Sequence, residues 1–164
     1  MWSLVTHQLE NARALATLDK GRPRQASLRR AVSTAYYGLF QALCEACAVK
    51  LVGWGKPWEA FTPIFRALEH NRVSDALAHR SFLNKPELQR LKVAFNELKT
   101  AREWADYSPE PRPNFVLADR DSPFTRGEAL TLIELAEEAI LILDRLDDGV
   151  RLELVARLVT KSRK

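Results

Sequence analysis

The sequence predicts an all-α protein, folded as an up-and-down bundle of four to five main helices. Apolar residues recur at spacings of three and four along nearly all of its 164 residues, which is the helical period. This length is typical of one domain, and the sequence shows no internal repeat and no second core. Short helices are expected between the second and the third long helix.

The first third of the chain predicts two helices. Residues 4–19 carry leucine and alanine on one side, and a Lys-Gly pair followed by Pro23 ends the pattern. The second helix begins near Ser27 and runs to about Leu51. Its apolar stripe keeps the helical spacing through Leu28, Val32, Ala35, Leu39 and Leu43.

The middle of the chain predicts two short helices and a third long one. The short helices cover residues 58–70 and 74–81 and are separated at Asn71. The long helix starts at Pro86, because proline is favoured in a first helical turn. Arg102 lies on the apolar face of this helix, and a charged side chain is unusual in that position.

The C-terminal part predicts a connection and two further helices. Four prolines between residues 108 and 124 indicate an extended, stiff loop with a functional or interface role. Thr125 and Glu128 have the capping-box spacing and begin the fourth long helix, which residues 147–149 end. Residues 150–160 are apolar enough for a last helix, although their alternating leucines are also compatible with a β-strand.

Two units are therefore expected: a bundle over residues 1–148, and a C-terminal helix with a basic tail, residues 149–164, packed on the bundle or extending from it. No stretch reaches the ~20 apolar residues of a membrane span. The N-terminus lacks the basic region of a secretory signal. We expect a cytoplasmic protein that has no membrane contact.

The two cysteines do not form the disulfide framework of a small secreted domain. Cys44 and Cys47 have the C-x-x-C spacing, but no second cysteine pair exists to complete a zinc site. We expect two small core residues, since free cysteine is often buried. A redox pair or a metal site is the alternative.

Charge is unevenly distributed along the chain, whose net charge is +4. Residues 20–44 hold five basic side chains and no acid, and residues 151–164 hold five basic side chains and one acid. Residues 119–148 hold nine acids and three arginines. This distribution predicts a basic face for phosphates, or pairing of acidic and basic elements across a dimer. Scattered, solvated charges are the plainer interpretation.

Several enzyme classes are excluded by the motifs that the sequence lacks. It contains no phosphate-binding loop, no dinucleotide-binding glycine motif, no nucleophile elbow and no H-E-x-x-H pair. With three histidines in all, a multi-histidine metal centre is not expected. His70 and His79 are expected at the surface or as helix caps.

Two motifs indicate a family. The second helix reads LRRAVSTAYYGLFQAL, and the third long helix ends in ADYSP. In this order they resemble the HEPN domain (higher eukaryotes and prokaryotes nucleotide-binding), in the branch that carries A-Y-Y-x-x-F and A-D-Y-x-P. The resemblance spans about residues 9–146. It implies a bundle of four or five helices that is commonly dimeric.

The resemblance also implies a function. Many HEPN domains are metal-independent endoribonucleases, often toxins paired with a small nucleotidyltransferase antitoxin, while others bind RNA or nucleotides without cutting. The catalytic pattern of the family is an arginine closely followed by a histidine. Arg102 matches that arginine, but Tyr107 stands where the histidine is expected.

This difference favours binding over cleavage. A tyrosine with a pKa near about 10 exchanges protons poorly at neutral pH. Arg102 still supplies a fork for phosphate. If the chain does cleave, Tyr107 or His79 would carry the proton, and His79 follows Arg72 at a similar spacing. The candidate catalytic residues are therefore Arg102 and Tyr107.

The candidate RNA or nucleotide contacts are the side chains that surround the two motifs, namely Arg29, Arg30, Tyr36, Tyr37, Arg102 and Asp106. Each has a plainer interpretation. The two tyrosines could be core aromatics, Arg102 and Asp106 an ordinary ion pair one helical turn apart, and the two N-terminal arginines solvated side chains.

The sequence thus predicts a HEPN-like protein that binds RNA or a nucleotide, such as the toxin-like member of a toxin-antitoxin or defence pair. We expect a homodimer without metal or other cofactor. One alternative is an active metal-independent endoribonuclease. Another is a non-catalytic interaction subunit, for instance for a nucleotidyltransferase antitoxin.

Overall fold

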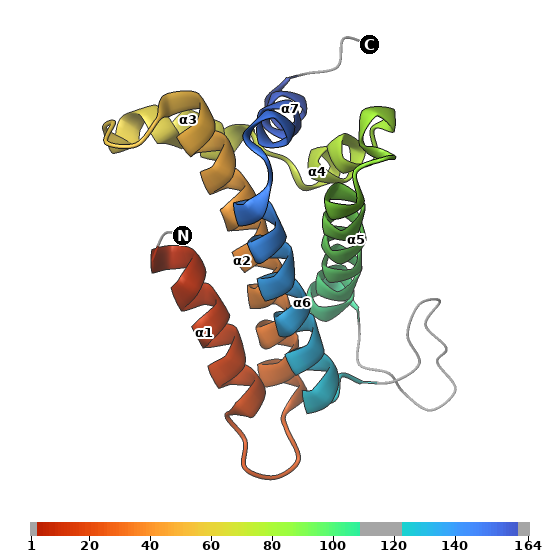
Figure 1. The fold of residues 1–164 in the computed structure, drawn as a ribbon. Helices are drawn as coiled ribbons and strands as arrows, with labels where there is room; N and C mark the ends of the chain where they lie inside the picture. The colour runs from red at the N-terminus through yellow and green to blue at the C-terminus, as the bar shows by residue number, and fades with distance from the viewer. Residues whose placement is uncertain (1–2, 109–122, 161–164) are drawn as a thin grey trace.

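The computed structural model describes residues 3–108 and 123–160, and every regular element in these ranges is a helix (Figure 1). The long helices are α1 (Ser3–Thr17), α2 (Gln25–Val52), α5 (Pro86–Tyr107) and α6 (Arg126–Arg145). They run alternately down and up the length of the molecule in Figure 1. The predicted all-α bundle is confirmed.

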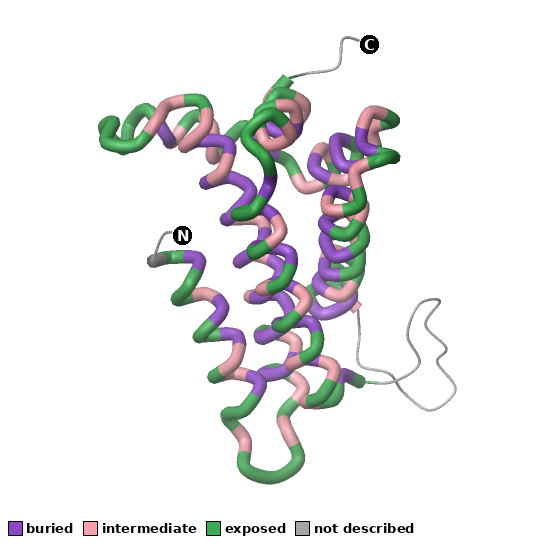
Figure 2. Tube along the Cα trace, in the orientation of Figure 1, coloured by how far each residue is buried: buried purple, intermediate pink, exposed green. Residues whose placement is uncertain are grey.

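Helix α2 is the central element, because it packs against α1, α5 and α6 as well as α3 and α7. Apolar side chains on several of its sides are buried, which suits a helix surrounded by others. Figure 2 shows buried residues along most of its length. Cys44 and Cys47 are two of these residues and are free thiols. Burial raises the pKa of both to about 12, so both remain protonated at neutral pH.

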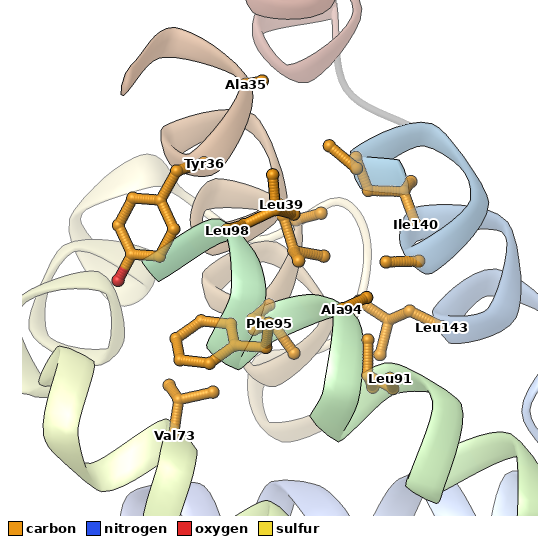
Figure 3. Packing of buried hydrophobic residues seen from close by; sticks show 14 of the residues in the cluster. Ala35, Tyr36, Leu39, Val73, Leu91, Ala94, Phe95, Leu98, Ile140 and Leu143 are labelled. Carbon is orange, nitrogen blue, oxygen red and sulfur yellow. The ribbon is translucent and has the colours of Figure 1, made fainter. Parts of the chain in front are cut away.

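The core lies around α2, with buried residues also from α1, α5, α6 and α7, and Figure 3 shows the part between α2, α5, α6 and α4. Leu39 from α2 meets Leu98 from α5, and Ile140 and Leu143 approach from α6. Phe95 is fully buried, and its ring centroid lies 5.6 Å from that of Tyr36. This contact joins the core to the tyrosines of the A-Y-Y motif.

The shorter elements gather at one end of the bundle (Figure 1). They are α3 (Trp58–Ala67), α4 (His70–Leu77), the 3-10 helix η1 (Arg80–Phe82) and α7 (Asp148–Val159). Helix α7 packs against α2 and α4. The last helix is therefore α-helical and packed on the bundle, and the alternative of a strand over residues 150–160 is wrong.

Two predicted boundaries need correction. The break between the short helices falls at Leu68 and Glu69, both extended, rather than at Asn71. Leu68 is buried, and we attribute the break to its packing in the core. The predicted end of the fourth helix at residues 147–149 is also wrong, because α6 ends at Arg145 and the Asp147 carboxylate caps α7 by accepting from the Gly149 N–H.

Other helix ends match the sequence signals. Thr125 and Glu128 form the predicted capping box, with the Thr125 hydroxyl accepting from the Glu128 N–H at 3.1 Å. Pro86 begins α5 as predicted. The proline-rich connection and the basic tail lie mostly outside the described residues. None of the described helices combines the length and apolar character needed to cross a bilayer.

Candidate functional site

The packing of α5 on α2 brings five of the predicted site residues together. Arg102 and Asp106 lie one turn apart near the end of α5 and so share one face. This face meets Tyr36 and Tyr37 of α2, and Tyr107 is the last residue of α5. These five residues are called the Arg102 cluster below.

Arg102 occupies the centre of the cluster. Its Nη2 donates a hydrogen bond to the Tyr37 hydroxyl at 2.9 Å, and its Nε lies 3.3 Å from Oδ2 of Asp106. The guanidinium carbon is 5.4 Å from each of the ring centroids of Tyr36, Tyr37 and Tyr107. Cations are attracted to aromatic faces at such distances. The guanidinium is therefore held in one place from several sides.

The Arg102 side chain is only 11% exposed, yet it stays charged. Burial on its own lowers the pKa of Arg102. The hydrogen bond to Tyr37 and the electrostatic influence of Tyr37, Tyr107 and Asp106 outweigh burial, so that this pKa is raised. The cluster thus presents a permanent cation near the protein surface.

Two other residues of α2 fasten the end of α5. The Ser33 hydroxyl donates to Oδ2 of Asp106 at 3.2 Å. Arg29 donates from Nη1 to the Ser108 carbonyl at 2.7 Å, and its guanidinium carbon lies 4.5 Å from the Trp104 ring centroid. Ser108 is the C-cap of α5, so Arg29 binds the negative end of the helix dipole. Arg29 therefore lies beside the cluster and supports it.

Arg30 lies apart from the Arg102 cluster, although it neighbours Arg29 in the sequence. Its side chain is exposed and lines a shallow pocket with Leu15 and Leu18, next to α1. Consecutive helical residues point about 100° apart, because a turn holds about 3.6 residues. The two predicted arginines are consequently separated.

His70 is a member of the site that the sequence analysis did not identify. It was expected at the surface or as a cap, but it is half-buried as the first residue of α4. Its Nδ1 lies 2.6 Å from the Tyr36 hydroxyl, and its ring centroid is 4.2 Å from that of Phe40. No local sequence signal marks this role, since His70 approaches Arg102 only through the fold.

The surroundings of His70 favour its neutral form. Burial lowers the pKa of His70, the cations Arg102 and Lys99 lower it further, and Glu103 opposes them. The imidazole is accordingly neutral at pH 7 and available to accept a proton.

His79 has the capping role that was expected for it. Its Nδ1 accepts from the Ser81 N–H at 3.2 Å at the start of η1. Among the described residues, no hydrogen bond or ion pair joins His79 to Arg72. No contact within this part of the chain supports Arg72 and His79 as a site.

Basic side chains collect at the bundle end where α5 finishes. The exposed Lys20 and Arg22 lie in the turn between α1 and α2. Arg126, at the start of α6, donates to the carbonyls of Asp19 and Gly21 and ties this turn to α6. The basic segment of the sequence therefore lies toward the same end as Arg102.

Within residues 3–108 and 123–160, no group of three or more His, Cys, Asp or Glu side chains converges to hold a metal ion. No protein-family model matches the sequence, and no curated protein or solved structure is significantly similar to it. The HEPN resemblance therefore rests on the two motifs and stays a prediction.

Proposed function

We propose that the Arg102 cluster binds the phosphate backbone of RNA. The observation that supports this most is the state of the Arg102 guanidinium. It is charged and fixed by Tyr37 and Asp106, while its Nη1 has no hydrogen-bond partner among the described residues. A guanidinium fixed in this way loses little freedom when it binds a phosphate oxygen.

Tyr107 adds a surface for a base. It is 74% exposed, and its ring lies beside the Arg102 guanidinium. Exposed aromatic rings next to cations are typical of proteins that bind single-stranded nucleic acid, because bases stack on the rings while phosphates meet the charges. The exposed Lys20 and Arg22 at the same bundle end extend the positive potential.

A phosphate site and a purely structural ion pair predict different effects of the Asp106 charge on RNA affinity. In a phosphate site, the Asp106 carboxylate repels the ligand. Asp106→Asn keeps an acceptor for the Ser33 hydroxyl but removes the charge next to Arg102. A unit charge about 7 Å from a phosphate changes affinity about threefold in water, so Asp106→Asn should bind RNA about threefold more tightly at low salt.

Fluorescence anisotropy with a labelled single-stranded RNA, measured over a series of salt concentrations, tests the proposal. Affinity should fall steeply with salt, because counterions are released from the phosphates. Glu97→Gln is the matched control: Glu97 is an exposed acid of α5 that lines a separate pocket with Trp104 of α5 and Leu132 of α6. Absence of RNA binding, or equal effects of the two substitutions, would contradict a phosphate site at Arg102.

A protein contact is the second candidate function, and one observation favours it. A groove of about 930 Å³ runs between α5 and α6, and the exposed apolar side chains of Val93 and Leu141 border it. We propose that a second copy of the chain covers this groove, in keeping with the predicted homodimer. Light scattering of the purified chain should give the dimer mass, and a monomer at all concentrations would contradict this second proposal.

A further inference from the structure

An open pocket lies beside the Arg102 cluster, along the C-terminal end of α5. Its lining consists of five residues near that end, namely Thr100, Glu103, Trp104, Tyr107 and Ser108. Thr100, Glu103 and Tyr107 follow one another at spacings of three and four, so their side chains share one face of the helix. The pocket has a volume of about 370 Å³, which is within the range of small-ligand sites. It is called the Tyr107 pocket below.

Tyr107 connects this pocket to the proposed phosphate site. The centroid of its ring lies 5.4 Å from the Arg102 guanidinium carbon. Because Tyr107 is 74% exposed, most of its surface is available beyond the contact with Arg102. The base and the phosphate of a nucleotide are joined through a single ribose. A nucleotide whose phosphate binds Arg102 can thus place its base against the Tyr107 ring, within the pocket.

Glu103 gives the pocket a hydrogen-bond acceptor. Its side chain is 51% exposed, and its Oε1 lies 4.0 Å from Nζ of Lys99, which is too long for a hydrogen bond. Nζ of Lys99 donates instead to Oδ1 of Asn71 at 2.7 Å. Among the described residues, the Glu103 carboxylate accepts no hydrogen bond. Its oxygens are therefore available to a ligand.

We infer that the Tyr107 pocket selects guanine in the bound RNA, and that Glu103 determines this specificity. The inference rests on the RNA binding proposed above. Guanine carries two neighbouring donors on its pairing edge, N1–H and N2–H, which match the two oxygens of one carboxylate. An ionised carboxylate only accepts hydrogen bonds. Proteins commonly recognise the bases of single-stranded RNA by stacking on an aromatic ring and by hydrogen bonds to this edge.

The other three bases fit the carboxylate less well. Adenine and cytosine each have one donor next to a ring nitrogen that accepts, and uracil has one donor between two carbonyl oxygens. In all three, a carboxylate oxygen faces an acceptor of the base, and two acceptors cannot form a hydrogen bond with each other. The Glu103 charge also repels the RNA phosphates. Guanine offsets this repulsion with two hydrogen bonds, so the same carboxylate disfavours the competing bases.

Fluorescence anisotropy with the full chain and labelled oligouridines tests the inference. The oligomers carry a single guanosine, adenosine, cytidine or inosine at the centre, or uridine throughout. The wild-type chain should bind the guanosine oligomer about 5- to 150-fold more tightly than the oligouridine, which is the discrimination of a good bidentate pair. Inosine lacks the 2-amino group and keeps the purine ring, so the inosine oligomer should lose part of this gain.

Glu103→Gln should abolish the preference for guanosine, because an amide offers one acceptor and one donor in place of two acceptors. Its affinity for oligouridine should not fall, since the substitution removes a negative charge near the phosphates. Glu97→Gln is the matched control, because Glu97 is an exposed acid of α5 outside the Tyr107 pocket. This control should keep the preference for guanosine.

The outcomes separate this inference from the proposed function. Equal affinity of the wild-type chain for all the oligomers, or a guanosine preference that persists in Glu103→Gln, overturns the inference and leaves RNA binding at the Arg102 cluster standing. The same change in affinity for every oligomer in Glu103→Gln shows a general charge effect and overturns it too. Failure of the wild-type chain to bind any oligomer contradicts the proposed function and the inference together.

Discussion

Replacing Phe95 with alanine is expected to lower the free energy of unfolding by about 3–5 kcal/mol. Phe95 is fully buried on α5, where Figure 3 shows it between Val73 of α4 and the leucines of the central core. Removal of its ring loses apolar burial and leaves a cavity that neighbouring helices fill only in part. Chemical denaturation followed by circular dichroism measures the change.

Leu152→Ala is the control for this substitution, because Leu152 is 50% exposed on α7 and lies outside the groove between α5 and α6. Its effect should stay within about 0.5 kcal/mol, as for most surface substitutions. Phe95→Ala should also weaken RNA binding, since the Phe95 ring packs on Tyr36 of the Arg102 cluster. A loss of stability below about 1 kcal/mol would contradict the position of Phe95 in the core.

Arg102→Gln is expected to weaken RNA binding about 10- to 150-fold, because a hydrogen bond to a charged group contributes about 1.5–3 kcal/mol. The slope of log affinity against log salt should also become shallower by about 0.7, which corresponds to one lost contact with single-stranded phosphate. Arg102→Lys should recover only part of the affinity, since lysine keeps the charge and lacks the planar fork. Anisotropy titrations at several salt concentrations give both quantities.

Arg90→Gln controls for the general loss of positive charge. Arg90 is an exposed arginine of α5 that lines the groove toward α6, away from the Arg102 cluster. Its loss should change RNA affinity less than about threefold, because salt screens exposed charges over about 10 Å. Equal losses in Arg90→Gln and Arg102→Gln would indicate nonspecific attraction to a basic protein.

The fold followed from the sequence wherever a local signal determined it. The capping box at Thr125 and the proline at Pro86 fixed helix starts, because both act through neighbouring residues. The sequence predicts the break between the short helices at Asn71, whereas the structure has it at Leu68. We attribute the observed break to packing of the Leu68 side chain in the core, which local sequence signals do not show. Asp147 follows the end of α6 and caps the start of α7, and since aspartate is favoured in both positions, the local sequence does not distinguish them.

The sequence predicts some residues of the candidate site and misses others. Arg102 stood out as a charge on an apolar face, and it is buried as that pattern requires. His70 could not be found in the same way, because its contact with Tyr36 joins residues that are 34 positions apart. Arg30 looked equivalent to Arg29, and only the direction of each side chain on α2 separates them.

The most direct measurement of RNA binding at the Arg102 cluster is photochemical crosslinking of a 4-thiouridine-labelled single-stranded RNA, with the attached residues identified by mass spectrometry. Crosslinks are expected on Tyr107 of α5 and on Tyr37, the partly exposed tyrosine of α2, and they should weaken in Arg102→Gln. Crosslinks confined to α1, α3 or α7, unchanged by that substitution, would contradict the assignment of RNA binding to this cluster.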